Sequence, residues 1–351
     1  MTGLRRRYYL AAGLALTCGC LFVLGLAAPA LFRLLAVSPA ETPDYGATIQ
    51  AIIAAAASQG PSSTPLSPTS TATPESASGQ PWGHIVFTCQ IGRTSIHICI
   101  MNADGSGYRR LKTDDSVVQY YPSLSPTGDS VVFSQYREPE IYEIYEMPID
   151  GGAPRRLTDR LGALTGPEIS PDGKSIAFMR SPPASDEYQV WLMDRDGGNP
   201  RRAIDGTGWD PTWSPDGGQI LFASDRGGSI QLYIANVDGQ GLHRISDLPA
   251  IRGRSDWSPQ GLVATYSGEA WKRELYVMGA DGSSPREVSP PGGNSQGPSF
   301  SPDGAWIAFT AYFDRFNDEN GCEIYVVRTD GSDLRRLTNN DYCDYQPRWG
   351  P

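Results

Sequence analysis

The sequence predicts an all-β protein: a six-bladed β-propeller of four-stranded blades, preceded by an N-terminal transmembrane helix and a disordered stalk. Three observations predict the propeller. The chain holds 39 Gly and 29 Pro among 351 residues, a composition that favours short strands and turns over helices. A Ser-Pro turn motif recurs at nearly constant spacing. An Asp-Gly motif alternates with it, as expected for hairpins in a repeat.

The charge of the chain is unevenly distributed. The formal net charge is −10, and residues 1–80 hold four arginines against three acidic residues, a net of +1 that leaves −11 for the rest. Binding to phosphate backbones needs a basic patch, so the acidic body argues against a nucleic-acid partner.

The N-terminus has the features of a membrane anchor. Residues 1–7 include three arginines, and residues 8–32 carry no charge, a run long enough for the roughly 20 residues that cross a bilayer. The arginines favour a cytoplasmic N-terminus and an extracytoplasmic body. Two alternatives stay open: residues 28–30 (Ala-Pro-Ala) resemble a signal-peptide cleavage site, and Cys20 could carry a lipid. All three interpretations export the body.

A low-complexity segment separates this anchor from the repeats. Residues 33–81 are dominated by Ser, Thr, Pro and Ala. That composition cannot bury a core, so an extended, flexible stalk is expected, with a short helix over residues 46–57. The propeller is predicted to occupy residues 82–351.

The Ser-Pro motif has five complete copies, each after a large apolar residue and each leading into a strand-like run such as QILFAS at residues 219–224. The serines lie 45, 44, 44 and 43 residues apart, namely Ser125, Ser170, Ser214, Ser258 and Ser301. Alternating apolar residues support the strands. A four-stranded unit of about 40–45 residues has the period of a propeller blade.

Asp-Gly pairs mark a second hairpin in each unit. Each follows a strand-like run and precedes a short segment such as PRRLT at residues 154–158. Glycine supplies the positive φ of the tight turn. The aspartates are Asp104, Asp150, Asp196, Asp238, Asp281 and Asp330. Each unit therefore has strand A before the Ser-Pro turn, B after it, C before Asp-Gly and D after it.

The two ends of the repeat region complement each other. The first unit lacks a strand A, and the chain ends with YQPRW at residues 345–349, a strand A without a strand B. This last strand can complete the first blade, which closes the ring as one strand plus three and removes its open edges. Six blades then account for residues 83–350.

The combined pattern, PxWSPDGxxIAF followed by IYxxxxDGxxxRRLT, resembles the repeat of the TolB-type β-propeller family and is related to the propellers of prolyl oligopeptidase-like enzymes. The resemblance implies a propeller over about three quarters of the chain. The family's N-terminal α/β domain, which engages the cell-envelope machinery, is replaced here by residues 1–81. No hydrolase domain flanks the repeats. Neither a Tol–Pal role nor peptidase activity is therefore expected to accompany the fold.

The sequence offers little evidence for catalysis or a metal. GNSQG at residues 293–297 matches the G-x-S-x-G nucleophile pattern, but His84, His97 and His243 all precede it, against the hydrolase order. The loop Asp314–Asn320 has oxygen ligands that suit Ca²⁺, but its spacing is not that of an EF-hand. The Ser-Pro turns are explained by turn geometry alone.

Four cysteines fall in the exported body, where disulfides persist. Cys322 starts a strand C and Cys343 follows strand D of the same blade, so this pair is expected first. Cys89 with Cys99 is then the remaining pair, although the inferred strand register places Cys89 opposite Ile96. Cys89 with Cys343, across the ring closure, is the rival pairing.

Candidate binding residues lie on strands A and on the loops between strands B and C. Strand A lines the channel, and the position after its proline, or after Ser255 in the strand that lacks one, carries Glu168, Asp256 and Arg348. The B–C loops, at the opposite end of the blades from the Ser-Pro turns, are expected to expose aromatic residues for binding. The candidates on these loops and at strand A entries are Tyr120, Tyr121, Trp209, Trp271, Tyr312, Phe313 and Phe316.

Together these features predict a membrane-tethered, monomeric, non-catalytic propeller outside the membrane, at the cell surface or in the periplasm. A protein, peptide or glycan of the cell envelope is the expected partner, and no cofactor is expected. The alternative is a lyase or hydrolase that acts on an extracellular polymer in the channel. That alternative requires Asp, Glu, Arg and His side chains to converge there.

Overall fold

The computed structural model describes residues 79–91, 95–111, 116–185, 187–315, 318 and 321–351, all within one compact unit, residues 45–351. The predicted anchor at 8–32 and almost all of the stalk lie outside the described residues. The described part contains 24 β-strands and no α-helix, which confirms the all-β fold. In this part there is accordingly no helix with the length and apolar character needed to cross a membrane.

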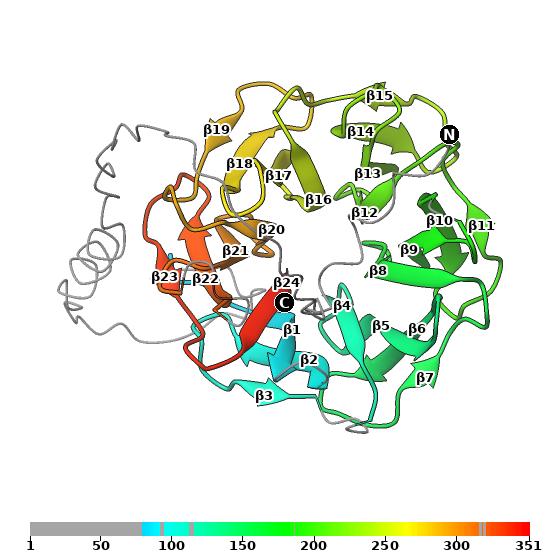
Figure 1. Ribbon diagram of the computed structural model, residues 1–351, viewed down its shortest axis with the longest axis horizontal. Helices are drawn as coiled ribbons and strands as arrows, with labels where there is room; N and C mark the ends of the chain where they lie inside the picture. The colour runs from blue at the N-terminus through cyan, green and yellow to red at the C-terminus, as the bar shows by residue number, and fades with distance from the viewer. Residues whose placement is uncertain (1–78, 92–94, 112–115, 186, 316–317, 319–320) are drawn as a thin grey trace, which may run out of the picture. The chain divides into compact units, whose positions relative to one another are not determined.

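The strands occupy four positions, from the innermost strand A to the outermost strand D (Figure 1). Strands A are β4 (Gln119–Leu124), β8 (Ala163–Ile169), β12 (Trp209–Trp213), β16 (Ile251–Trp257), β20 (Gln296–Phe300) and β24 (Cys343–Gly350). Strands B are β1 (His84–Ile91), β5 (Ser130–Glu138), β9 (Ser175–Ser181), β13 (Gln219–Ser224), β17 (Leu262–Ser267) and β21 (Trp306–Ala311). Strands C are β2 (Ser95–Asn102), β6 (Ile141–Pro148), β10 (Gln189–Asp194), β14 (Gln231–Asn236), β18 (Glu274–Gly279) and β22 (Glu323–Arg328). Strands D are β3 (Arg109–Arg110), β7 (Arg155–Arg156), β11 (Arg201–Arg202), β15 (His243–Arg244), β19 (Arg286–Glu287) and β23 (Arg335–Arg336).

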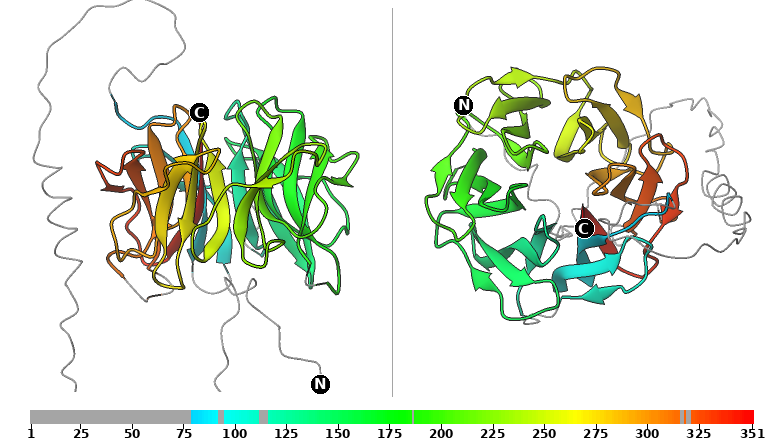
Figure 2. Two further views of the ribbon diagram at one scale, coloured as in Figure 1. Left: turned by 90° about the horizontal axis from the view of Figure 1, so that it is seen from above. Right: turned by 180° about the vertical axis from the view of Figure 1, so that it is seen from behind.

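Each set of A, B, C and D strands pairs antiparallel in that order, and we call such a set a blade. Four sheets are single blades: β24-β1-β2-β3, β12 to β15, β16 to β19 and β20 to β23. The blades β4 to β7 and β8 to β11 form one larger sheet through a single parallel pair, Tyr142 with Ala163. The blades surround a common axis, and their strands run between the two ends of the ring (Figures 1 and 2).

The C-terminal strand completes the first blade, as the sequence predicts. β24 pairs antiparallel with β1, from Gln90 opposite Cys343 to His84 opposite Gly350. The edge of β1 that faces the axis is therefore paired, and β24 becomes the innermost strand of a blade that would otherwise lack one.

The Ser-Pro turn is held by its serine hydroxyl. Ser214 Oγ donates to Asp216 Oδ1 at 2.6 Å and accepts from the Gln219 amide at 2.9 Å. The Gly217 amide donates to the Ser214 carbonyl at 2.9 Å, and Gly217 has a φ of 73°, which glycine adopts without strain. Serine, aspartate and glycine each have a defined role in joining strand A to strand B.

The threonine after strand D fastens the outer edge of a blade. The Thr158 hydroxyl donates to Glu143 Oε2 at 2.5 Å and accepts from the Ile144 amide at 3.0 Å. The Thr338 hydroxyl donates to Glu323 in the same way at 2.6 Å. Strand D is only two residues long and makes few backbone hydrogen bonds to strand C. The threonine bonds to the start of strand C therefore supply the contacts that a longer strand D would make.

The first arginine of strand D connects neighbouring blades. Arg109 Nη2 donates to the Ile149 carbonyl at 2.7 Å, and Arg155 Nη1 donates to the Asp196 carbonyl at 3.4 Å. Arg286 bonds the corresponding carbonyl, that of Thr329, in the blade after its own. These bonds explain why the repeated segment is basic in an acidic domain.

The hydrophobic core lies between adjacent blades. Phe87 and Met101 of the first blade pack against Trp306 and Ile324 of the last, all nearly fully buried. Corresponding clusters fill the other junctions, for example with Phe133 between the first two blades. A blade cannot bury its faces alone, so the ring is the unit that supplies a closed core.

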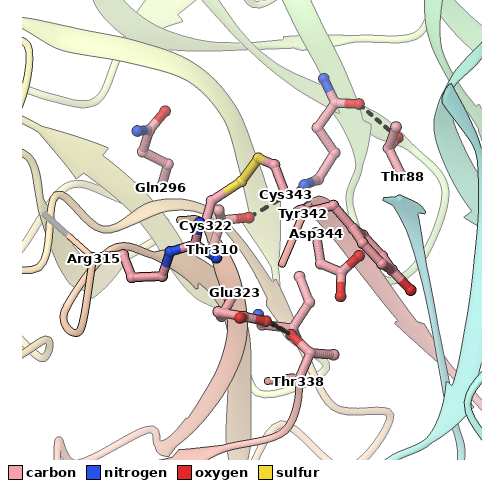
Figure 3. Close-up of a disulfide and its surroundings, with 12 residues drawn as sticks. Thr88, Gln296, Thr310, Arg315, Cys322, Glu323, Thr338, Tyr342, Cys343 and Asp344 are labelled. Carbon is pink, nitrogen blue, oxygen red and sulfur yellow. Dashed lines mark hydrogen bonds between the residues drawn. A yellow bond between two sulfur atoms is a disulfide. The ribbon is translucent and has the colours of Figure 1, made fainter. Parts of the chain in front are cut away.

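Two disulfides lie beside the ring closure. Cys322–Cys343 joins the residue before β22 to the first residue of β24, with Cα atoms 4.6 Å apart (Figure 3). Because β22 belongs to the last blade and β24 to the first, this bond covalently links the two blades at which the ring closes.

The second disulfide links β1 to β2. Cys89 bonds Cys99 with Cα atoms 5.8 Å apart, so the rival pairing of Cys89 with Cys343 is not formed. The expected register was off by one residue: Cys89 lies opposite His97, not Ile96. The bond therefore runs diagonally between the strands, two positions along β2.

Asp344 is fully buried next to the Cys322–Cys343 disulfide (Figure 3). Burial raises its pKa to about 7; the hydrogen bond from Asn340 Nδ2 opposes the rise and the nearby Glu323 adds to it. The pKa of an unperturbed aspartate is 3.8, so the folded state binds the proton more tightly than the unfolded state. Asp344 therefore contributes a loss of stability as the pH rises from about 4 to about 7.

We predict that Asp344→Asn raises the free energy of unfolding at pH 8 by about 1–3 kcal/mol and changes it little at pH 4, because the substitution removes the cost of ionising a buried carboxyl. Guanidinium chloride denaturation of the full-length chain at the two pH values measures this. Asp104→Asn is the control: hydrogen bonds from Ser106 lower the pKa of this exposed turn carboxyl. An equal effect of Asp344→Asn at both pH values would contradict the prediction.

Candidate functional site

A β-bulge in every strand A shapes the lining of the channel. The pairing of strand A with strand B shifts register at this place in all six strands, for example between Trp209 and Thr212. The residue before the strand A proline has positive φ at Tyr121 (54°), Asp210 (49°) and Gln346 (58°). A bulge re-aims side chains, so residues on both sides of the proline approach the channel in two layers.

The layer after the proline alternates hydroxyl and charged side chains around the channel. Its members are Ser123, Glu168, Thr212, Asp256, Ser299 and Arg348. The structure brings the three charged candidates together. Arg348 Nη2 lies 3.4 Å from Glu168 Oε2, and Arg348 Nη1 lies 3.8 Å from Asp256 Oδ1. The Arg348 side chain is 4% exposed and each carboxylate side chain 15%.

Each of the two carboxylates is positioned by the following blade. Glu168 Oε1 accepts from the Thr212 hydroxyl at 2.6 Å, and Asp256 Oδ2 accepts from the Ser299 hydroxyl at 3.0 Å. The backbone amide after each hydroxyl donates to the same oxygen, at 3.4 Å and 2.6 Å respectively. The hydroxyl members of the layer therefore hold the acidic members in place and couple one blade to the next.

Arg348 is anchored chiefly by backbone carbonyls. Its Nη1 donates to the Pro298 carbonyl and its Nη2 to the Ser255 carbonyl, both at 3.1 Å. Its distances to Glu168 and Asp256 exceed the roughly 2.7–2.9 Å of a charge-assisted hydrogen bond. Glu168 Oε2 and Asp256 Oδ1 thus retain capacity to accept a further hydrogen bond.

A second layer, before the proline, contains Tyr121, Asp210 and Arg254. The Arg254 guanidinium is 5.8 Å from the centre of the Tyr121 ring. Burial, together with the neighbouring Arg348, lowers the pKa of Arg254 to about 9, although Glu168 and Asp210 oppose the change. Burial raises the pKa of Asp210, with the two arginines opposing. One cation and one anion balance each other in this layer.

Burial also raises the pKa of Glu168. Arg348 and the hydrogen bond from Thr212 oppose this rise, while the negative charge of Asp256 adds to it. Glu168 therefore keeps its proton to a higher pH than a free glutamate, and the negative charge of the first layer increases as the pH rises.

A cavity of about 420 Å³ opens at the end of the channel where the Ser-Pro turns lie. Two carboxylates, Glu168 and Asp256, contribute to its lining. The apolar and aromatic lining residues include Pro126, Pro171, Pro215, Pro259, Pro302, Pro351, Trp213, Trp257 and Trp349. The turns therefore line a cavity besides joining strands, and this cavity lies at the opposite end from the B–C loops, where binding was predicted; that prediction stays untested.

The aromatic candidates lie at the B–C loop end and differ in exposure. Trp209 and Phe313 are only 9% and 7% exposed, so they belong to the core and not to an exposed surface as expected. Both sit at junctions between blades, where apolar area is buried. Trp271 and Tyr312 pack edge to face with ring centres 5.0 Å apart. Phe316 lies outside the described residues.

Tyr120 and Tyr121 are partly buried at the same end. The Tyr120 ring lies 6.2 Å from that of Tyr142, and burial raises the pKa of Tyr120 to about 12. Burial also raises the pKa of Tyr121. Both side chains therefore remain neutral phenols at physiological pH.

The structure offers no support for a metal centre or a serine nucleophile. No group of three or more His, Cys, Asp or Glu residues able to hold a metal occurs in the described part of the chain. The proposed Ca²⁺ loop lies partly outside it, and Asp314 pairs with Arg336. Ser295 of the G-x-S-x-G pattern is 0% exposed, and no histidine lines the cavity described above.

Reasoning from the sequence missed Arg254, Asp210 and the tryptophans that line the cavity. In the sequence, hydroxyl and charged residues alternate from blade to blade at the position after the strand A proline, and this pattern indicates the first layer. The second layer had no such signal, because a regular strand would have directed these residues away from the axis. Only the bulge brings them into the channel.

Comparison with known proteins agrees with the fold. No protein-family model matches the chain. It is 29% identical over 185 residues to the uncharacterized protein Atu1656 of Agrobacterium fabrum, covering 49% of this chain and 61% of that one. It is 28% identical over 177 residues to the Tol-Pal system protein TolB of Anaeromyxobacter dehalogenans, covering 49% and 40%. The chain thus spans less than two thirds of the length of these relatives.

Solved structures give the same result. TolB from Acinetobacter baumannii superposes with a TM-score of 0.66 at 21% identity, covering 77% of this chain and 67% of that one. A putative TolB from Agrobacterium tumefaciens gives a TM-score of 0.57 at 18% identity, covering 77% and 99%. The chain therefore has the β-propeller fold of these TolB structures.

We predict that Arg348→Gln lowers the free energy of unfolding by about 2–4 kcal/mol, because Glu168 and Asp256 lose the cation between them. Guanidinium chloride denaturation of the full-length chain measures this, with Arg201→Gln on the exposed strand β11 as control. Adding Glu168→Gln to Arg348→Gln should restore part of the loss. If the Arg348 and Arg201 variants were equally stable, the channel charges would not be coupled as described.

Proposed function

We propose that this TolB-like propeller is a six-bladed, non-catalytic binding protein of the cell envelope that holds a segment of a protein partner at its channel mouth. The channel mouth is the cavity lined by the Ser-Pro turns, Glu168 and Asp256. The observation that carries the proposal is the cavity of about 420 Å³ among the Ser-Pro turns. Binding pockets are typically concave, largely apolar and equipped with a few positioned polar groups. This cavity combines such features: proline and tryptophan surfaces with two carboxylates.

The lining suits a polypeptide segment. Prolines restrict the backbone of the turns, so the rim requires little ordering when a partner binds. Tryptophan is enriched among energetically dominant contacts between proteins. Trp257 is partly exposed at the cavity, whereas Trp213 and Trp349 line it with only 6% and 8% of their surface exposed. One relative is named as a Tol-Pal system protein, which supports an envelope role without transferring its partners to this chain.

The alternative, a lyase or hydrolase in the channel, has less support. Glu168 and Asp256 are each held by a hydroxyl and an amide, and Arg348 by two carbonyls, so these charges are fixed in place, and no histidine is among the residues that line the cavity beside them. Relatives include an uncharacterized peptidase, YuxL of Bacillus subtilis, and a puromycin hydrolase structure. The matched region covers only 32% and 46% of these proteins.

We further propose that residues 8–32 anchor the chain in a membrane, residues 33–81 form a stalk, and the propeller, residues 82–351, is monomeric and extracytoplasmic. The uncharged run after three arginines supports the anchor and its orientation. The two disulfides support an oxidising compartment, since such bonds rarely persist in the cytosol.

Capture of partners from intact envelopes tests the binding surface. We predict that Pro171→Arg/Pro259→Arg, which places two long side chains at the mouth, lowers recovery of the main cross-linked partner at least tenfold. The control Pro183→Arg/Pro285→Arg carries the same substitutions at exposed prolines that do not line the cavity, and it should recover the partner normally. Equal recovery by both variants would exclude the mouth as the binding surface.

A reporter fused after residue 351 tests the topology. We predict that alkaline phosphatase, which needs oxidised cysteines, is active in this position, and that a reporter requiring the cytoplasm is inactive. Deleting residues 8–32 should reverse both results, because the arginines alone do not translocate the body. Activity of only the cytoplasmic reporter in the intact chain would contradict an extracytoplasmic propeller.

A further inference from the structure

We infer that the channel mouth recognises a cationic side chain, a lysine or arginine of the bound segment, through Glu168 and Asp256. This inference rests on the proposed function and names the chemistry of the group that enters the cavity. Four observations support it: the charge of the lining, two carboxylate oxygens that lack a short hydrogen bond, their partial burial and the apolar rim around them.

Every charged side chain that lines the cavity is an acid. Glu168 and Asp256 contribute to the lining, whereas Arg348 and Arg254 do not. Around the channel, two carboxylates face one arginine in the first layer, and Asp210 and Arg254 offset each other in the second. When both carboxylates are ionised, the layer nearest the cavity has an excess of negative charge, which a ligand cation would neutralise.

Two carboxylate oxygens are available to such a cation. The Glu168 and Asp256 oxygens that face the next blade are occupied by hydroxyl and amide donors at 2.6–3.0 Å. Among the described residues, Glu168 Oε2 accepts one long hydrogen bond, from Arg348 Nη2 at 3.4 Å, and Asp256 Oδ1 lies 3.8 Å from Arg348 Nη1. An ammonium or guanidinium group offers several N–H donors and can reach both oxygens at once.

The carboxylates are recessed but accessible. The side chains of Glu168 and Asp256 are each 15% exposed, so a ligand can reach them although most of the surrounding water is excluded. An ion pair in such a setting is less screened than one on the surface.

The rim fits the rest of a lysine or arginine side chain. These residues bury their methylene stems against apolar surface while the charged head reaches a polar site. The prolines and the partly buried Trp257 supply most of that surface, and Trp213 and Trp349, 6% and 8% exposed, contribute only ring edges. Tryptophan rings also attract a cation within about 6 Å of their centres. The Trp213 ring is fixed by its Nε1, which donates to the Glu168 carbonyl at 3.0 Å.

The same geometry predicts how affinity changes with pH. Glu168 is faced by Arg348 on β24, Asp256 and Arg254 on β16, and Thr212 on β12. Its pKa is raised by burial, so raising the pH increases its ionised fraction and should strengthen binding of a cation. A neutral or acidic side chain at the mouth would show no gain.

Selection from a phage-displayed library of random heptapeptides on the immobilised full-length chain tests the inference. Peptides are counter-selected on Pro171→Arg/Pro259→Arg, so that only mouth-dependent binders remain. We expect one position of these peptides to be occupied by lysine or arginine. The most enriched peptide and its analogue with norleucine at that position are then titrated by fluorescence anisotropy. The analogue should bind at least about tenfold more weakly.

Matched variants assign the effect to the two carboxylates. Glu168→Gln/Asp256→Asn, and each single variant, should weaken the cationic peptide but leave the norleucine analogue unchanged. Asp238→Asn/Glu269→Gln removes the same charge from exposed positions and should have no effect. Mouth-dependent peptides without a preferred cation, or equal affinity of both peptides, would overturn the inference and leave the proposed function standing. A selection without any mouth-dependent peptide would contradict both.

Discussion

The closure of the ring by β24 is the interaction on which the rest of the structure depends. The pairing of β24 with β1 completes the first blade, and the Cys322–Cys343 disulfide fastens the same strand to the last blade. The core lies between blades, so an open ring would leave two of its faces without partners. β24 also carries Arg348, and the site therefore forms only when the ring closes.

The repeat made most of the fold predictable. Ser214, Asp216 and Gly217 specify a turn by short-range bonds that any copy can make alone, so their recurrence identified the blade. The complementary ends of the repeat region likewise predicted the closure. The register of Cys89 with His97 was missed by one residue, because the length of the intervening hairpin does not determine the pairing.

The site was only partly predictable, for a related reason. Glu168, Asp256 and Arg348 occupy one repeat position and were found by aligning the copies. Asp210 and Arg254 reach the channel through bulges, which depend on the closure of neighbouring blades and leave little trace in one strand's sequence. The cavity at the turns is a property of the assembled ring, in which separate prolines converge, and no single copy of the motif indicates it.

The position after the strand A proline explains where binding chemistry can arise in a repeat of this kind. Most positions in a blade pack against the next blade, and they must accept the same side chains in every copy. The position after the proline faces the axis, where no further strand packs. Glu168, Asp256 and Arg348 therefore depart from the repeat while the hydroxyls between them keep the blades joined. The Ser-Pro turn residues stay the same from blade to blade because the turn geometry requires them. The cavity that these turns form gives a partner access to Glu168 and Asp256.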